Sequence, residues 1–225
     1  LIEKTFNLNG ANGGQNGDTG GKRTFASGAG GDDDLGAEVR AGESGASDAY
    51  TTTGGIGGGR HNDSSTGTRG GGGGGFGGRG GDSLTDSPRG GSRYGRLDLA
   101  ELGTKNGPRA GSGGGASNRG AGGAGGGAIQ LLAVNDVTIA SGISIRANGG
   151  RGNSAGSTNV EKRRTAGGGS GGAIRIVADL DRDGFGQAST LGANLSASGG
   201  VSDNATTTME YGGGGGGGRI LVRGV

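Results

Sequence analysis

Glycine dominates this chain. It makes up 66 of the 225 residues, while cysteine and tryptophan are absent, proline occurs twice and histidine once. This composition excludes a disulfide scaffold and a cysteine-ligated zinc or iron–sulfur centre, and the glycine run 70–75 breaks the triplet rule of collagen. The sequence has no stretch of about 18 apolar residues that could span a membrane. The formal net charge of +2 is too small to steer nucleic acid strongly.

The chain begins with a segment typical of a strand, Leu1-Ile-Glu-Lys-Thr-Phe-Asn-Leu, in which apolar and polar residues alternate. It carries neither an initiator methionine nor a recognisable signal peptide. We therefore expect a processed or truncated product, and an extracellular or cell-surface location is compatible with the absence of cysteine.

Residues 15–120 keep the glycine but contain few large apolar side chains; residues 51–83 hold only Ile56 and Phe76. The candidate strands here are weak: Val39 and the run 97–102. We divide the chain into a glycine-rich region with sparse strands (1–124) and a β-repeat region (125–225), which together form one continuous domain.

Arg69, Arg79 and Arg89 each precede two glycines at intervals of ten residues, and Phe76 lies between the first two. This pattern resembles an RGG box, in which arginine and aromatic side chains bind single-stranded RNA. Solvated arginines on a glycine scaffold are the simpler interpretation, because there is one aromatic residue and Asp82 and Asp86 dilute the charge.

Three glycine tracts in the region 125–225 each run into a strand-like segment, and the first isoleucines of these segments, Ile129, Ile174 and Ile220, are 45 and 46 residues apart. A second motif follows the first two: residues 143–150 resemble residues 194–200, and both resemble residues 6–14. Asn135 and Asp136 predict a turn between two strands. A fixed period of this length indicates a repeat array or solenoid.

Side-chain burial alone cannot order so much glycine, because glycine loses more backbone entropy on folding than any other residue. Bare glycine backbones can, however, approach closely and hydrogen-bond between extended or polyproline-II-like segments. Helices are not expected, since glycine interrupts every window of helical length. We therefore predict an all-β fold, a repeat β-solenoid or stacked β-sandwich with packed, polyglycine-II-like segments.

The segments 171–178, 196–200 and 212–222 resemble the glycine-rich β repeats of large secreted bacterial surface proteins. The glycine tracts are also similar to the polyglycine-II bundles of certain antifreeze proteins and phage tail-tip adhesins. The first resemblance covers residues 125–225 and implies extracellular display. Neither resemblance assigns a reaction or a catalytic residue to this chain.

One segment has the pattern of a calcium loop. Asp179, Asp181 and Asp183 place oxygen ligands at alternate positions, and Gly184 allows the sharp turn. The twelfth position of the loop, where a bidentate acid is expected, is Thr190. A polar turn after the strand 174–178 is the alternative, and Asp32–Asp34 form a second, weaker oxygen cluster.

Three N-glycosylation sequons begin at Asn62, Asn194 and Asn204. They are frequent by chance in a chain rich in serine and threonine, and they matter only in a glycosylating secretory route.

Enzymatic function is not expected. A Ser–His–Asp triad would have to use His61, and the Gly-x-Ser-x-Gly match at residues 152–156 lacks the helix that a nucleophile elbow requires.

The two chain ends are both strand-like and carry no capping helix, so they leave open sheet edges. Heterologous contacts between such edges would form filaments. We therefore expect an extracellular structural protein that self-associates through its terminal strands; pairing of the termini with internal strands, leaving a monomer, is the alternative. The rival functions are a receptor- or glycan-binding adhesin module that displays Arg79 and Tyr94, an ice-binding surface, and the RGG-type RNA-binding segment.

Overall fold

The computed structural model describes ten segments of the 225-residue chain. These segments are residues 1–10, 36–40 (backbone), 71–83, 90–94, 110–116, 121–153, 165–178, 187–190, 192–202 and 212–224.

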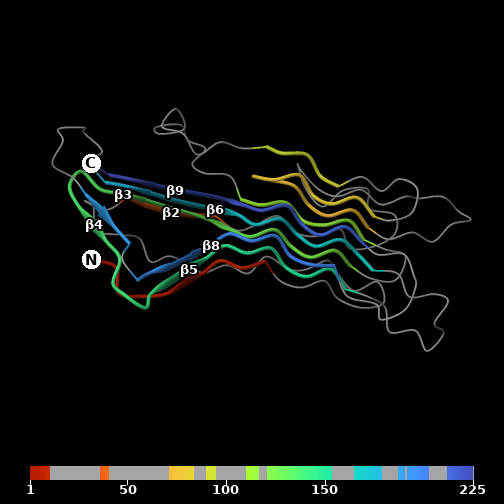
Figure 1. Cartoon of the computed structure of the whole chain (residues 1–225), viewed down its shortest axis with the longest axis horizontal. Helices are drawn as coiled ribbons and strands as arrows, with labels where there is room; N and C mark the ends of the chain where they lie inside the picture. The colour runs from red at the N-terminus through yellow and green to blue at the C-terminus, as the bar shows by residue number, and fades with distance from the viewer. Residues whose placement is uncertain are drawn as a thin grey trace, which may run out of the picture.

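Nine short strands and no helix occur in these segments (Figure 1). The larger sheet has the order β2 (Gly36–Arg40), β3 (Ala128–Leu132), β6 (Ala173–Val177) and β9 (Arg219–Arg223). A second sheet has the order β1 (Phe6–Asn7), β5 (Ser144–Arg146) and β8 (Asn194–Ser196), and β4 (Val137–Thr138) pairs with β7 (Ala188–Ser189). All pairings are parallel except that of β2 with β3.

The expectation of strands without helices is thus confirmed for the described residues. The coils of a β-solenoid are not observed among them. Strands β1 and β2, from the glycine-rich N-terminal part, pair with β5 and β3 of the repeat region. None of the described segments forms a helix long and apolar enough to cross a membrane.

The sequence repeat sets the register of both sheets. Ile129, Ile174 and Ile220 lie side by side on β3, β6 and β9, and Phe6, Ile145 and Leu195 do so on β1, β5 and β8. The period of about 45 residues is therefore the length of chain between one parallel strand and its neighbour. Gly142 and Gly192, which precede β5 and β8, both have positive φ angles, 79° and 74°, a conformation that glycine adopts without strain.

The three-stranded sheet, which we call the smaller sheet, is joined to the larger sheet where its strands end and those of the larger sheet begin. The amides of Gly127, Gly172 and Gly218 donate to the carbonyl oxygens of Leu8, Ala147 and Ala197, at 2.7, 2.7 and 2.6 Å. These bonds join β1 to β3, β5 to β6 and β8 to β9. We call each such pair a rung; the described chain contains three rungs, and β2 is an additional antiparallel strand at the edge of β3.

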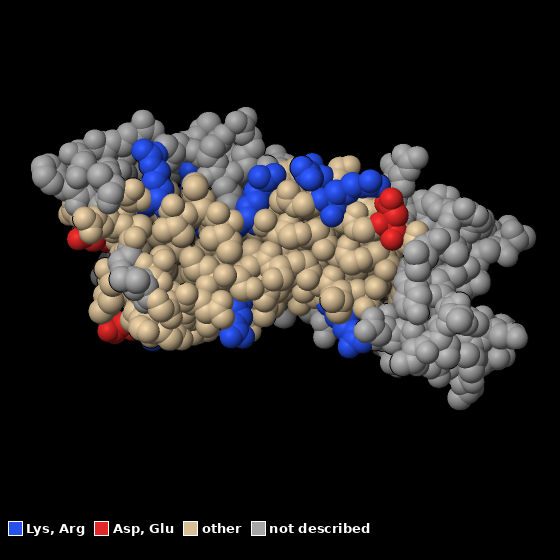
Figure 2. Space-filling model, viewed as in Figure 1, with Lys and Arg blue, Asp and Glu red and all other residues tan. Residues whose placement is uncertain are grey.

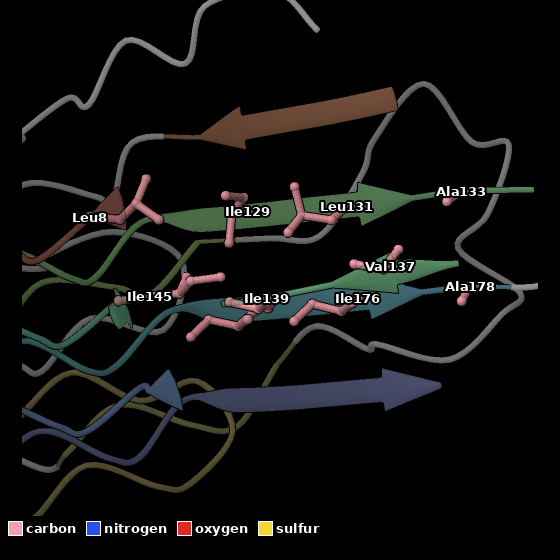
Figure 3. Packing of buried hydrophobic residues seen from close by; sticks show 11 residues of the cluster. Leu8, Ile129, Leu131, Ala133, Val137, Ile139, Ile145, Ile176 and Ala178 are labelled. Atoms are coloured by element: carbon pink, nitrogen blue, oxygen red, sulfur yellow. The ribbon is translucent and has the colours of Figure 1, made fainter. Parts of the chain in front are cut away.

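The hydrophobic core lies between the two sheets (Figure 3). Period-two alternation turns Ile129 and Leu131 of β3, and Ile174 and Ile176 of β6, toward Leu8, Val137, Ile139 and Ile145. Each fully buried side chain of this size contributes about 1.5–3 kcal/mol to folding. Asn135 and Asp136 predict a turn between two strands; the structure has a bend at Val134 and Asn135, between β3 and β4.

The opposite face of the larger sheet is also covered. Phe76 is fully buried there against Ala128 and Ala173, and Tyr94, Ala110 and Leu221 pack on them. Away from the sheets, the chain continues in glycine-rich tracts that run side by side without forming strands (Figure 1).

Candidate functional site

The glycine tracts form a body held together by backbone hydrogen bonds. The tract 165–172 shows the pattern most completely, because it donates in turn to three neighbouring tracts. Residues three apart donate to the same neighbour: Gly167 and Ser170 to tract 110–116, Gly168 and Gly171 to tract 212–218, and Gly169 and Gly172 to tract 147–153.

The carbonyl oxygens of the same tract accept bonds with the same spacing. Thr165 and Gly168 accept from Gly71 and Gly74, Gly167 and Ser170 accept from Gly123 and Gly126, and Gly169 accepts from Gly200. Three tracts thus receive hydrogen bonds from tract 165–172 and three others give hydrogen bonds to it. The central tract is therefore surrounded by six neighbours.

Glycine is required at this packing distance. A Cβ atom added to Gly169 would lie closer than 3.0 Å to the carbonyl oxygen of Ala124, and one added to Gly168 would lie equally close to that of Gly200. Real Cβ atoms essentially never approach a carbonyl oxygen so closely. Two serines are also buried within the body, Ser112 and Ser170, and they contact each other. Ser170 Oγ accepts from the Ser112 amide at 2.9 Å.

A ladder of short polar side chains links the rungs where the strands pass into the glycine tracts. Asn9 Oδ1 accepts from the amide of Asn148 at 3.0 Å. Asn148 Oδ1 in turn accepts from the amide of Ser198 at 2.8 Å and from the hydroxyl of Ser196 at 2.6 Å. Asn148 and Ser198 each precede a glycine pair of the sequence repeat, and Asn9, which is followed by Gly10, occupies the matching place beside β1, so the repeated motif has a structural role.

The RGG-like segment is engaged in packing. Phe76 is fully buried, its ring meets that of Tyr94 edge to face at a centroid distance of 5.0 Å, and the Arg219 guanidinium lies 5.6 Å from its ring centre. Tyr94 donates its hydroxyl to the Ala110 carbonyl oxygen at 2.6 Å. Phe76 is thus not available for stacking on a base in this structure.

Arg79, the arginine of this segment that the structure describes, is half-exposed and forms an ion pair with Asp82 at 2.7 Å. Asp82 also accepts from the amide of Gly90 at 2.7 Å. Arg69 and Arg89 lie outside the described residues. Charged side chains lie mainly along the margins of the face shown in Figure 2, and its middle is uncharged.

The other residues singled out in the sequence are distributed as follows. Asp179, Asp181 and Asp183, the sequons at Asn62 and Asn204, His61 and Ser154 all lie outside the described residues. Asn194 is exposed on β8, but the Ser196 hydroxyl of its sequon donates to Asn148. Within the described ranges, no group of three or more histidine, cysteine, aspartate or glutamate residues could hold a metal ion.

The sequence did not indicate that Arg175 would be buried. Arg175 is completely buried on β6 and donates from Nη1 to Gln130 Oε1 on β3 at 3.1 Å. Alternation with Ile174 and Ile176 does predict that Arg175 points away from the core between the sheets. The signal that this second face is also covered was the aromatic pair Phe76 and Tyr94, which is distant in sequence.

The larger sheet ends with an uncovered apolar edge. Ile220 and Val222 on β9 are 44% and 39% exposed, although their partners Ile174 and Ile176 on β6 are completely buried. Strand β9 pairs only with β6, so its outer edge carries no strand among the described residues. Strand β8, which contacts β9, likewise ends the smaller sheet.

Comparison of the chain with protein-family models, with curated proteins and with solved structures gave no match.

Proposed function

We propose that this chain is an extracellular structural protein whose glycine tracts form a rigid, polyglycine-II-like body, and that it self-associates through its terminal strands. The observation that carries the proposal is the hydrogen bonding of tract 165–172, whose donors three residues apart reach the same neighbour. A polyproline-II helix has three residues per turn, so each of its sides faces a different neighbour in just this way.

The steric requirement supports a rigid body over a flexible tether. A tether needs no glycine at particular positions, whereas here an added Cβ would overlap a neighbouring carbonyl oxygen at most described glycines of the tracts. The body therefore has the close backbone contact that a load-bearing or space-filling element requires. Extracellular location follows the resemblance to the glycine-rich repeats of secreted surface proteins.

Self-association rests on the two ends of the sheets. Strand β1 forms one edge of the smaller sheet, and β9 forms one edge of the larger sheet. Open edges of this kind pair with further strands, and a contact between unlike edges of successive copies would propagate into a filament.

Electron microscopy and sedimentation of the purified chain test the proposal. We expect filaments or a concentration-dependent series of oligomers, and we expect the double substitution Ile220→Lys and Val222→Lys to abolish them. The control is Val134→Lys, because Val134 is similarly exposed (48%) but lies in the bend between β3 and β4. Dispersed monomers at high concentration would refute self-association, and a random-coil hydrodynamic radius would refute the rigid body.

A further inference from the structure

The outer side of tract 212–218 is a second open surface, continuous with the exposed edge of β9. The three sides of this tract have different surroundings. On the first side, a Cβ added to Gly213 would meet the carbonyl oxygen of Gly81, and one added to Gly216 would meet that of Gly78. On the second side, a Cβ added to Gly215 would meet the carbonyl oxygen of Gly169, and one added to Gly218 would meet that of Gly172. On the third side, Gly217 meets nothing within 4 Å, and Gly214 meets only the Gly200 carbonyl oxygen at 3.9 Å.

Exposure follows the same spacing. Gly214, Gly217 and Ile220 are exposed, whereas Gly212, Gly213 and Gly216 are buried. Residues three apart share one side of a segment with three residues per turn. The open side of the tract is therefore followed directly by the exposed apolar side chain of Ile220 on β9, and Gly214, Gly217 and Ile220 form one line of exposed positions.

The same two glycines also lack hydrogen-bond acceptors within the described segments, although the amide and the Cβ direction of one glycine face adjacent neighbours: the Gly168 amide donates to Gly213, whereas its added Cβ would meet Gly200. Among residues 213–219, the amides of Gly213, Gly215, Gly216, Gly218 and Arg219 each donate to a carbonyl oxygen of another tract. The amides of Gly214 and Gly217 have no acceptor among the described residues. Tract 165–172, by comparison, donates from every residue between 166 and 172.

We propose that the line Gly214–Gly217–Ile220 is the docking site for another glycine tract that runs into a strand, added in parallel as a fourth rung by a second chain that carries this repeat. The argument is continuity with an interface already present: β9 and tract 212–218 cover β6 and tract 165–172 in the same way. The incoming segment would accept from the amides of Gly214 and Gly217 and cover Ile220 and Val222.

The existing rungs define what such a segment must contain. Each has glycine two residues before its first isoleucine: Gly127, Gly172 and Gly218 before Ile129, Ile174 and Ile220. An added Cβ at Gly172 or Gly218 would meet the carbonyl oxygen of Gly127 or Gly172 on the preceding rung. The partner must therefore carry glycine at this position, glycine three residues earlier, and Ile, Leu or Val at alternate positions of its strand.

A peptide with the sequence of residues 167–178 is the probe. It contains the last glycines of a tract and the whole of β6. We expect saturable binding to the full chain, with slower hydrogen exchange at the amides of Gly214 and Gly217. Two peptides of identical composition supply the control. The peptide with Gly169→Ala and Gly172→Ala has its methyl groups on the side that faces the chain, so it should not bind. The peptide with Gly168→Ala and Gly171→Ala has its methyl groups on the side that faces away from the chain, so it should bind.

Gly217→Ala in the chain is the matching protein variant. Its Cβ enters open space, so we expect folding to be unaffected. At the equivalent Gly171, an added Cβ would lie 2.6 Å from the amide nitrogen of Gly218 on the next rung, so the Cβ at position 217 should block an incoming backbone. We expect it to lose peptide binding while keeping the melting temperature. Three results would each overturn the proposal: saturable binding that survives Gly217→Ala, equal binding of both alanine peptides, or no binding of the parent peptide.

The strand direction can be tested by disulfide formation, because the chain has no cysteine of its own. Neighbouring strands lie about 4.8 Å apart, which is within the Cα separation of a disulfide. Parallel addition places peptide position 176 beside Val222. The variant Val222→Cys should therefore cross-link to a peptide with Ile176→Cys and not to one with Ile174→Cys; the reverse preference indicates antiparallel pairing and overturns the fourth rung.

This inference goes beyond the proposed filament and does not require it. If the chain is monomeric but binds the peptide, self-association fails and the docking site stands. If the chain forms filaments that neither the peptide nor Gly217→Ala affects, the docking site fails and self-association stands.

Discussion

Ile174 and Ile220 are neighbours in register on adjacent parallel strands, yet Ile174 is completely buried and Ile220 is 44% exposed. Both residues begin the apolar part of their strands after a glycine tract. Only their surroundings differ: β6 has a parallel strand on each side, and β9 has one on a single side. The last rung of the array thus keeps the sequence of an internal rung without its full burial.

Substitution by alanine should separate these two isoleucines. Ile174→Ala removes a completely buried side chain, and we expect it to lower the free energy of unfolding by about 2–5 kcal/mol. Ile220→Ala should cost about 1 kcal/mol or less, because much of its surface already contacts water. Differential scanning calorimetry of both variants measures the difference; equal losses would mean that β9 is covered in solution.

The glycines of the tracts offer a second matched pair. Gly169→Ala forces a Cβ against the Ala124 carbonyl oxygen, and overpacking of this kind costs about 1–3 kcal/mol. In a chain of this size, each kcal/mol lowers the melting temperature by about 2–4 °C. Gly217→Ala points into open space and should leave the melting temperature unchanged. A body of loosely arranged tracts would tolerate both substitutions equally well.

Sequence reasoning could predict the pairing of the repeats because it rests on side chains. The spacing of Ile129, Ile174 and Ile220 and their β-branched character indicate equivalent strands, and these strands are indeed adjacent. Val39, a weak strand candidate, lies in β2, but nothing in its sequence indicates that β2 would pair antiparallel with β3. The run 97–102 lies outside the described residues.

The arrangement of the tracts could not be predicted, although their close packing was expected. Glycine carries no side chain that could distinguish one neighbour from another, so the choice of tract 212–218 beside tract 165–172 follows from the strands to which they lead. The burial of Phe76 was hidden for a related reason. Its flanking glycines are typical of an exposed arginine–glycine segment, whereas here they let the ring reach the sheet.

The polar ladder should contribute measurably to stability. Asn148→Ala removes an oxygen that accepts from the Ser198 amide and the Ser196 hydroxyl, leaving both donors without this partner. The Ser198 amide is exposed and the Ser196 hydroxyl is partly buried, so we expect a loss of about 0.5–1.5 kcal/mol, the net contribution of a typical hydrogen bond. Asn148→Asp keeps the oxygen and tests whether the acceptor alone is sufficient. Urea unfolding of both variants checks this, and a wild-type midpoint for Asn148→Ala would show that solvent replaces the ladder.

Hydrogen exchange on the unmodified chain distinguishes ordered tracts from flexible ones residue by residue. The amides of Gly168, Gly169 and Ser170 donate to carbonyl oxygens at 3.0, 2.9 and 2.9 Å within the six surrounding tracts, so they should exchange only when the body opens. Those of Gly214 and Gly217 have no acceptor in the described part of the chain and should exchange within the dead time. We therefore expect fast exchange at every third amide of tract 212–218 and slow exchange at the amides between, which is the signature of a segment with three residues per turn. Uniformly fast exchange through both tracts would mean that polyglycine does not pack backbone against backbone in this protein.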